Sequence, residues 1–164
     1  MNHRSHAVQL ASLPSMGTQP AYIEGLIRQI WPHRAEEIYS LFVNGGSDID
    51  AATDHPFVVT LDGEPIGITG FYKYDGRDVG LCWHGIIPAH RGKGLSRAAF
   101  AQVRALAADT YQTATDIIEL IPSDKEQDLS PYFRNLGFAH HGEVATFDYL
   151  PKGPEWRVYR APLV

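Results

Sequence analysis

The chain has 164 residues, of which 44% are hydrophobic, and carries a formal net charge of −5 at pH 7. The length and composition predict one globular domain over residues 1–164 with a sizeable core. The acidic balance argues against a nucleic-acid partner, because proteins that bind nucleic acids are usually basic. The single cysteine, Cys82, excludes a disulfide framework and favours a reducing, cytoplasmic compartment. No apolar run approaches the ~20 residues of a membrane span, so we expect no membrane partner.

The first half of the chain predicts one strand, two helices and three further strands. Alternating apolar residues predict a short strand from Val8 to about Leu13. Apolar residues at helical spacing predict helices over residues 20–31 and 35–42, and the second helix stops at Asn44-Gly45-Gly46. Period-two patterns separated by Asp-Gly turns predict strands over residues 57–61, 66–73 and 79–87.

The second half predicts two helices and three strands. An Ala-rich helix begins at Leu95 and continues to about Leu106, and a short apolar strand follows over residues 117–121. A helix over residues 129–136 is stopped by Gly137, and strands over 139–149 and 156–161 close the chain. The predicted order is β-α-α-β-β-β-α-β-α-β-β.

Residues 91–96 form a Gly-rich, basic turn between an apolar strand and the Ala-rich helix. Such a turn leaves backbone N–H groups unpaired at the positive end of the helix dipole. Gly92 and Gly94 let a ligand approach the main chain, and Arg91, Lys93 and Arg97 add positive charge. The turn therefore predicts a binding site for a phosphorylated ligand.

Two common phosphate-binding signatures do not fit this turn. A Walker loop would need Gly at Ile87 and Ser or Thr at Gly94. The dinucleotide fingerprint would need a small residue at Arg97 and an acidic residue on a following strand. The eight histidines include no zinc-type spacing, so we expect no metal.

The spacing Arg-x-x-Gly-x-Ser over residues 91–96 resembles the acyl-CoA pyrophosphate loop of the GNAT superfamily of N-acetyltransferases. The family pattern is Gln/Arg-x-x-Gly-x-Gly/Ala, so Ser96 departs mildly from it. Residues 130–138 are similar to the family's helix ending in Tyr-x-x-Leu-Gly-Phe. The predicted order of elements also matches that family over nearly the whole chain.

The resemblance implies an α/β (α+β) fold, with a mixed, mostly antiparallel seven-stranded sheet flanked by about four helices. It implies transfer of an acetyl group from acetyl-CoA to a primary amine of a small molecule, amino acid or peptide, by direct attack in a ternary complex. It implies a monomer or a homodimer. A non-catalytic acyl-CoA-binding module of the same fold is the alternative, and an unrelated nucleotide-binding enzyme is a third reading.

The resemblance also assigns cosubstrate-binding residues. The pyrophosphate would lie on Gly92, Lys93, Gly94, Leu95 and Ser96, with Arg91, Lys93 and Arg97 supplying charge. The thioester carbonyl would be polarised by the backbone N–H groups of Ile86 and Ile87. A bulge at Gly85 would open the strand edge for the pantetheine arm; close packing against a helix is the other explanation for this glycine.

Three side chains are candidates for proton transfer. Family members often place a Glu early on the fourth strand, but residues 80–82 contain none, so His84 is the first candidate base and Glu119 the second. His84 could instead hydrogen-bond within the core, Glu119 could pair with an arginine, and a water chain could replace either. The family's acidic tyrosine falls in register on Phe133, so Tyr132 is the candidate acid only if the helix brings it to the sulfur; otherwise it packs.

The acceptor side is the least determined by the sequence. Its candidate residues lie in the first helices, the loop after them and the final hairpin: Tyr22, Trp31, His33, Asp48, Asp50, Asp54, His55, Tyr149 and Trp156. The three carboxylates could attract a cationic amine or only be solvated. The aromatic residues could line a pocket or belong to the core.

Overall fold

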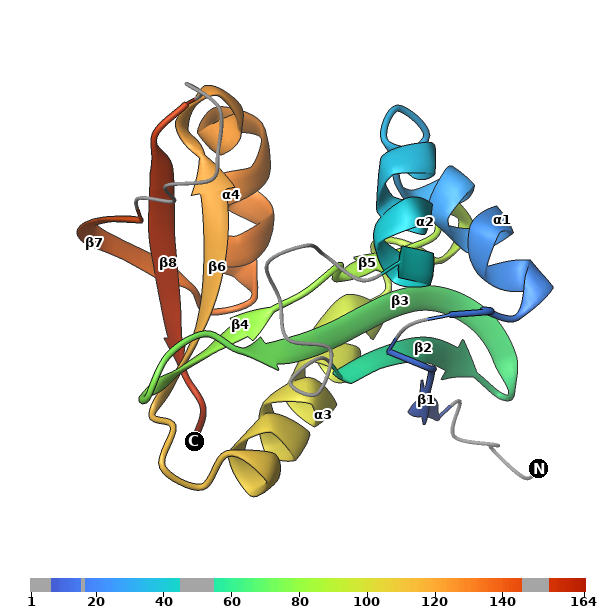
Figure 1. Cartoon of the computed structure of the whole chain (residues 1–164), viewed down its shortest axis with the longest axis horizontal. Helices are drawn as coiled ribbons and strands as arrows, with labels where there is room; N and C mark the ends of the chain where they lie inside the picture. The colour runs from blue at the N-terminus through green and yellow to red at the C-terminus, as the bar shows by residue number, and fades with distance from the viewer. Residues whose placement is uncertain (1–6, 16, 45–54, 146–153) are drawn as a thin grey trace.

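The computed structural model describes residues 7–15, 17–44, 55–145 and 154–164 (Figure 1). The first half contains β1 (Val8–Ser12), α1 (Ala21–Ile30), α2 (Ala35–Asn44), β2 (His55–Leu61), β3 (Glu64–Lys73), β4 (Asp78–Leu81) and β5 (Gly85–Ile86). The second half contains α3 (Leu95–Thr110), β6 (Asp116–Pro122), α4 (Glu126–Asn135), β7 (Ala139–Ala145) and β8 (Trp156–Pro162). The predicted helices and strands are present near their predicted places, except that one strand is divided. Residues 146–149, the last part of the strand predicted over 139–149, lie outside the described residues.

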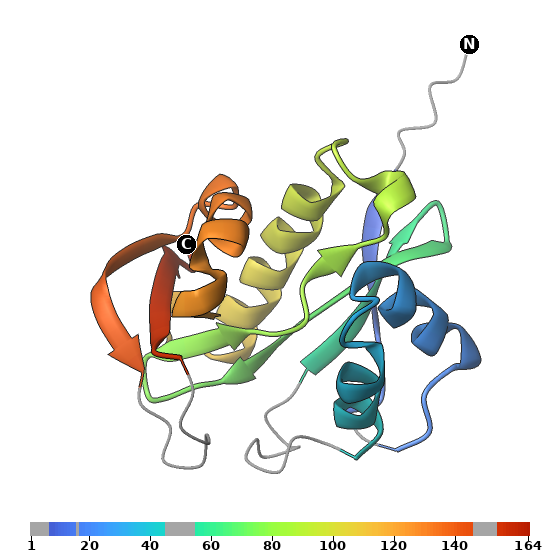
Figure 2. The ribbon, with the colours of Figure 1, turned by 90° about the horizontal axis from the view of Figure 1, so that it is seen from above.

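The strands form one mixed, mostly antiparallel sheet in the order β1-β2-β3-β4-β6-β8-β7, and β5 pairs with β3. The β4–β6 pairing is parallel, and the other pairings are antiparallel. Apolar residues of α1 and α2 pack with Val58 and Ile68, whereas α3 and α4 pack with Phe71 and Ile117. The two helix pairs therefore cover opposite faces of the sheet (Figure 2).

The sheet has eight strands instead of seven because the strand predicted over residues 79–87 is interrupted. β4 ends at Leu81 and β5 begins at Gly85, and between them Trp83 has a φ of +49°. A left-handed backbone costs a residue with a side chain about 1–2 kcal/mol. The Trp83 ring packs against Trp31 and Phe42, at centroid distances of 6.3 and 6.4 Å, and this packing holds the break in place.

The break opens the sheet at one end. β4 pairs with β6 only as far as Gly80 and Ile118, whereas β5 continues along β3 opposite Ile68 and Gly67. β5 and β6 therefore diverge from each other (Figure 1). Among the helices of the described residues, none combines the length and the apolar character that a membrane crossing requires.

Candidate active site

A cavity of about 460 Å³ lies where the sheet opens. Its walls come from the end of α1, from β5 and the loop after it, from the start of α3 and from α4. Trp31, Ile86, Gly94, Ser96, Tyr132 and Phe133 are among its lining residues. The break in the predicted strand thus creates the space in which a ligand can lie beside the edge of β5.

The Gly-rich turn meets this cavity with free backbone donors. Gly92 and Gly94 have φ values of +74° and +75°, and Gly94 is the N-cap of α3. The first helical hydrogen bond is donated by the N–H of Ala98 to the carbonyl of Gly94, at 3.1 Å. Within the described part of the chain, the N–H groups of residues 92–97 have no backbone or side-chain acceptor. These donors, at the positive end of a 16-residue helix, fit the oxygens of a diphosphate.

Three basic residues in and next to the turn hold it in place by donating hydrogen bonds to backbone carbonyls. Arg91 donates from Nε to the Ile86 carbonyl at 2.8 Å and from Nη2 to the Ile30 carbonyl at 3.4 Å. Lys93 donates to the Ala89 carbonyl at 3.1 Å, and Arg97 donates to the Asn135 carbonyl of α4 at 2.9 Å. The cations therefore fix the turn against α1, β5 and α4 while keeping their positive charge close to the free amides.

Only one of the two predicted thioester donors is available. The N–H of Ile87 donates to the Ile66 carbonyl of β3 at 2.9 Å. Because hydrogen-bonding positions alternate along an antiparallel strand, the N–H of Ile86 points away from β3, as does its carbonyl, which accepts from Arg91. Ile86, and not Ile87, therefore presents a donor along the open edge.

The role expected of Gly85 is carried out by another residue. The backbone irregularity lies at Trp83, whereas Gly85 is paired with Ile68. A Cβ atom on Gly85 would lie 2.4 Å from Cγ2 of Ile30 and 2.9 Å from Cζ2 of Trp31. Gly85 is thus required by the close approach of α1, which is the alternative explanation.

His84 is buried, and both of its ring nitrogens have hydrogen-bond partners. Nδ1 lies 2.8 Å from Oγ1 of Thr69, and Nε2 lies 2.9 Å from Oγ of Ser96. Burial lowers the pKa of His84 to about 4, so the ring is neutral near pH 7. His84 therefore lies beside the cavity, but with neither nitrogen free to bind an amine directly.

Tyr132 lines the cavity and has a hydroxyl to offer there. Phe133, which is in register with the family's tyrosine, has none. Oη of Tyr132 lies 2.5 Å from Oγ of Ser96. Phe133 packs in the core against Phe138, with ring centroids 5.8 Å apart. Burial raises the pKa of Tyr132, so its hydroxyl keeps its proton near pH 7.

Glu119 lies on β6 one residue beyond the last β4–β6 pair. By alternation it shares a face with Ile117 and Ile121, which pack against α3 and α4. Burial raises its pKa well above the usual range, and its negative charge helps to raise the pKa of Tyr132. No arginine pairs with it within the described residues, so the expected alternative of an ion pair is not found there.

The structure separates the acceptor-side candidates. Trp31 lines the main cavity, and Tyr22 and His33 are exposed. His55 is a packing residue, since its ring stacks on Phe71 at 4.7 Å and its Nε2 lies 3.0 Å from Oη of Tyr111. Trp156 is half-buried on β8, opposite Pro122. Asp48, Asp50, Asp54 and Tyr149 lie outside the described residues.

Two residues gain a role that the sequence did not indicate. Thr69, on β3, is buried beside His84, and its one sequence signal is a polar residue inside an apolar strand. Ser96 was expected to bind through its backbone, but its hydroxyl also joins His84 to Tyr132. No three His, Cys, Asp or Glu side chains lie close enough together to hold a metal in the parts of the chain that are described.

Comparison with known proteins finds a matching family. The sequence pattern of the acetyltransferase (GNAT) family matches residues 21–138. A comparison with curated proteins finds no match.

Solved structures share the fold at low sequence identity. A protein assigned to the GNAT family from Desulfovibrio desulfuricans has a TM-score of 0.68 at 18% identity, over 96% of this chain and 100% of its own. A GNAT family acetyltransferase from Elizabethkingia anophelis, solved with acetyl-CoA bound, has a TM-score of 0.59 at 12% identity, over 94% and 97%. The spermidine N-acetyltransferase from Vibrio cholerae, in complex with CoA and spermine, has a TM-score of 0.58 at 18% identity, over 95% of each chain.

Proposed function

The chain belongs to the acetyltransferase (GNAT) family, and on this premise we propose that it transfers an acetyl group from acetyl-CoA to a primary amine. The amine belongs to a small molecule, an amino acid or a peptide. The observation that carries the proposal is the row of unpaired N–H groups over residues 92–97, which opens into the cavity beside β5. The single cysteine of the sequence supports a cytoplasmic setting.

The pyrophosphate of acetyl-CoA would be held by those amides, with Arg91, Lys93 and Arg97 supplying the surrounding positive charge. Solved structures with the same fold that contain acetyl-CoA or CoA support acetyl-CoA as the cosubstrate. The pantetheine arm would run along the free edge of β5, where the N–H of Ile86 would donate to the thioester carbonyl. Polarising that carbonyl makes its carbon easier for an amine to attack.

The amine reaches the site protonated near pH 7 and must lose a proton before it can attack. Of the two candidate bases, Glu119 is the stronger, because burial raises the pKa of its carboxyl group well above the usual range. His84 has both nitrogens engaged and a pKa of about 4, so we assign it an indirect part through Ser96. Tyr132 would protonate the leaving thiolate, since this residue lines the same cavity.

A thermal shift with acetyl-CoA tests the binding step. Ligand at 100 times its Kd stabilises a protein by about 2.7 kcal/mol, which raises Tm by about 5–10 °C for a chain of this length. Gly94→Val should abolish the shift, because a side chain at φ +75° distorts the turn. Gly63→Val is the matched control: its φ is +88° and its surroundings are equally open, but it lies in the β2–β3 turn.

Turnover is then read as free CoA thiol released with a panel of amines. Stabilisation by acetyl-CoA with thiol release for one amine class supports the proposal. Stabilisation without release for any amine supports the non-catalytic acyl-CoA-binding module instead. Stabilisation by ATP but not by CoA contradicts both and favours a nucleotide-binding enzyme.

A further inference from the structure

Four polar side chains form one hydrogen-bonded chain between the sheet and the cavity. Oγ1 of Thr69 lies 2.8 Å from Nδ1 of His84, Nε2 of His84 lies 2.9 Å from Oγ of Ser96, and Oγ of Ser96 lies 2.5 Å from Oη of Tyr132. Thr69 is at the buried end and Tyr132 at the cavity. Each inner group accepts from one neighbour and donates to the other, so the direction of one bond sets the direction of all.

Thr69 decides that direction. Its side chain is on β3, and the residue is only 1% exposed. Among the residues that the structure describes, its hydroxyl has Nδ1 of His84 as its one partner. A buried donor without an acceptor costs about 1–3 kcal/mol, whereas an unused oxygen lone pair costs much less. The Thr69 hydroxyl must therefore donate to Nδ1.

The remaining bonds follow from the chemistry of the side chains. A neutral imidazole has one N–H, so when Nδ1 accepts, Nε2 carries the proton and donates to Oγ of Ser96. Because Oγ of Ser96 accepts from His84, the Ser96 hydroxyl donates its own proton to Oη of Tyr132. Because Oη accepts from Ser96, the proton of Tyr132 is free to point into the cavity.

We propose that Thr69 is a positioning residue, which acts through His84 and Ser96 to present the proton of Tyr132 to the leaving sulfur. This inference rests on the proposed acetyltransferase function. The C–N bond to the amine forms and the C–S bond breaks, with its electron pair passing to sulfur. The attacking nitrogen, which is cationic once the bond has formed, releases one proton to water, and sulfur takes the proton of Tyr132. The phenolate left behind is stabilised by the hydrogen bond from Ser96 and regains a proton from water. In the opposite direction, Tyr132 would donate to Ser96 and present only lone pairs to the cavity.

The sequence departs from the family pattern at Ser96 and at Phe133, and the hydrogen-bonded chain connects the two departures. A Gly or Ala in place of Ser96 has no hydroxyl with which to connect His84 to α4. A tyrosine at Phe133 would start from a position about 100° around the helix. Ser96 and Tyr132 are thus complementary, since each is the other's hydrogen-bond partner.

The tautomer of His84 tests the direction of the chain without any need for activity. In ¹⁵N-labelled protein at pH 7, long-range ¹H–¹⁵N correlation identifies which ring nitrogen carries the proton, and His84→Gln assigns the signal by its loss. We expect the Nε2–H tautomer in the wild type and a mixture, or the Nδ1–H tautomer, in Thr69→Val. An Nδ1–H tautomer in the wild type overturns the inference, even if the protein acetylates no amine.

Kinetics test the consequence for Tyr132. Thr69→Val keeps the shape of the side chain but removes the donor, and we expect kcat to fall about tenfold while KM for acetyl-CoA changes less than twofold. Thr69→Ser keeps the hydroxyl and should retain most of the wild-type kcat. Thr60→Val, at a half-buried position of β2, is the control for a Thr-to-Val change. A Thr69→Val variant with wild-type kcat overturns the positioning role, whereas a wild type that acetylates no amine contradicts the proposed function alone.

Discussion

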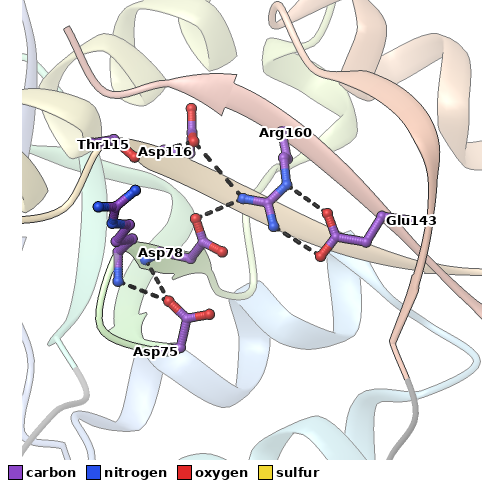
Figure 3. Close-up of polar contacts among 7 residues, drawn as sticks. Asp75, Asp78, Thr115, Asp116, Glu143 and Arg160 are labelled. Carbon is purple, nitrogen blue, oxygen red and sulfur yellow. Dashed lines mark hydrogen bonds and ion pairs between the residues drawn. The ribbon is translucent and has the colours of Figure 1, made fainter.

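The parallel pairing of β4 with β6 has an open end, where the two strands separate, and a closed end, where ion pairs link the strands. At the open end, the strands diverge around a cavity whose rim carries unpaired backbone donors. At the closed end, Arg160 of β8 joins carboxylates from three other strands (Figure 3). The two halves of the sheet meet through only three residue pairs, from Asp78–Asp116 to Gly80–Ile118. A sheet that opens at one end for a ligand therefore needs strong attachment at the other.

At the closed end, the charge of Arg160 is balanced by neighbouring carboxylates. Arg160 donates to Oδ1 of Asp78 at 2.6 Å and forms a bidentate ion pair with Glu143 at 2.7 and 2.8 Å. Nη1 of Arg160 also lies 3.8 Å from Oδ2 of Asp116. The carboxylates raise the pKa of Arg160 above its usual value, so its charge is permanent. The open end instead leaves donors and positive charge for a ligand to satisfy. The contrast shows that one strand junction supports both stability and binding.

Breaking the closed end should have the largest effect on stability. Arg160→Met leaves the carboxylate of Asp78 buried without its partner, since that side chain is only 7% exposed. We expect the free energy of unfolding to fall by about 3 kcal/mol, measured by urea denaturation. Arg28→Met, which removes an exposed pair with Glu24 on α1, should cost less than about 0.5 kcal/mol. Equal losses in the two variants would mean that the closed end is not the main attachment.

Acid should weaken the open end through His84. Its pKa is about 4 in the folded protein and about 6.5 when unfolded, so only the unfolded state gains a proton between these values. The stability due to neutral His84 is complete above pH 6.5 and is lost as the pH falls toward 4, by on the order of 3 kcal/mol. His84→Gln should flatten this part of the stability–pH curve. Parallel curves for the wild type and the variant would contradict the burial of a neutral ring.

Glu119 lies one residue beyond the last β4–β6 pair. Replacing its carboxyl group should raise the stability of the protein and lower the rate of the reaction. Its raised pKa means that the unfolded state releases its proton more easily, so Glu119 reduces stability as the pH rises above about 4.3. Glu119→Gln should therefore be more stable than the wild type at pH 7, with the difference vanishing near pH 4. The same variant should lose about 100-fold in kcat, because it removes the base.

The matched control is Glu64→Gln, at the exposed start of β3, which should change neither quantity. A stable Glu119→Gln variant with full activity would assign the base to another group or to water. A variant that is less stable at pH 7 would instead mean that the carboxylate has a stabilising partner.

Local features of the chain could be predicted from the sequence because they depend on neighbours along the chain. Apolar spacing predicts α1 and α2, and Asp62-Gly63 predicts the turn between β2 and β3. Gly94 before an Ala-rich segment predicts the start of α3 with its free amides. The division of residues 79–87 into two strands could not be predicted in this way, because the rings of Trp31, just after α1, and of Phe42, on α2, hold Trp83 in its left-handed conformation.

The sequence by itself determined the family of this protein and the main-chain site for a diphosphate, since glycine conformation and the dipole of one helix are local properties. Only the tertiary structure decided which groups meet in the cavity. Thr69, His84, Ser96 and Tyr132 come from different parts of the chain, and their contacts span 15, 12 and 36 residues. It also decided that Ile86 keeps a free N–H while Ile87 pairs with β3. Such outcomes depend on strand register and on helix rotation, which packing sets and local pattern does not.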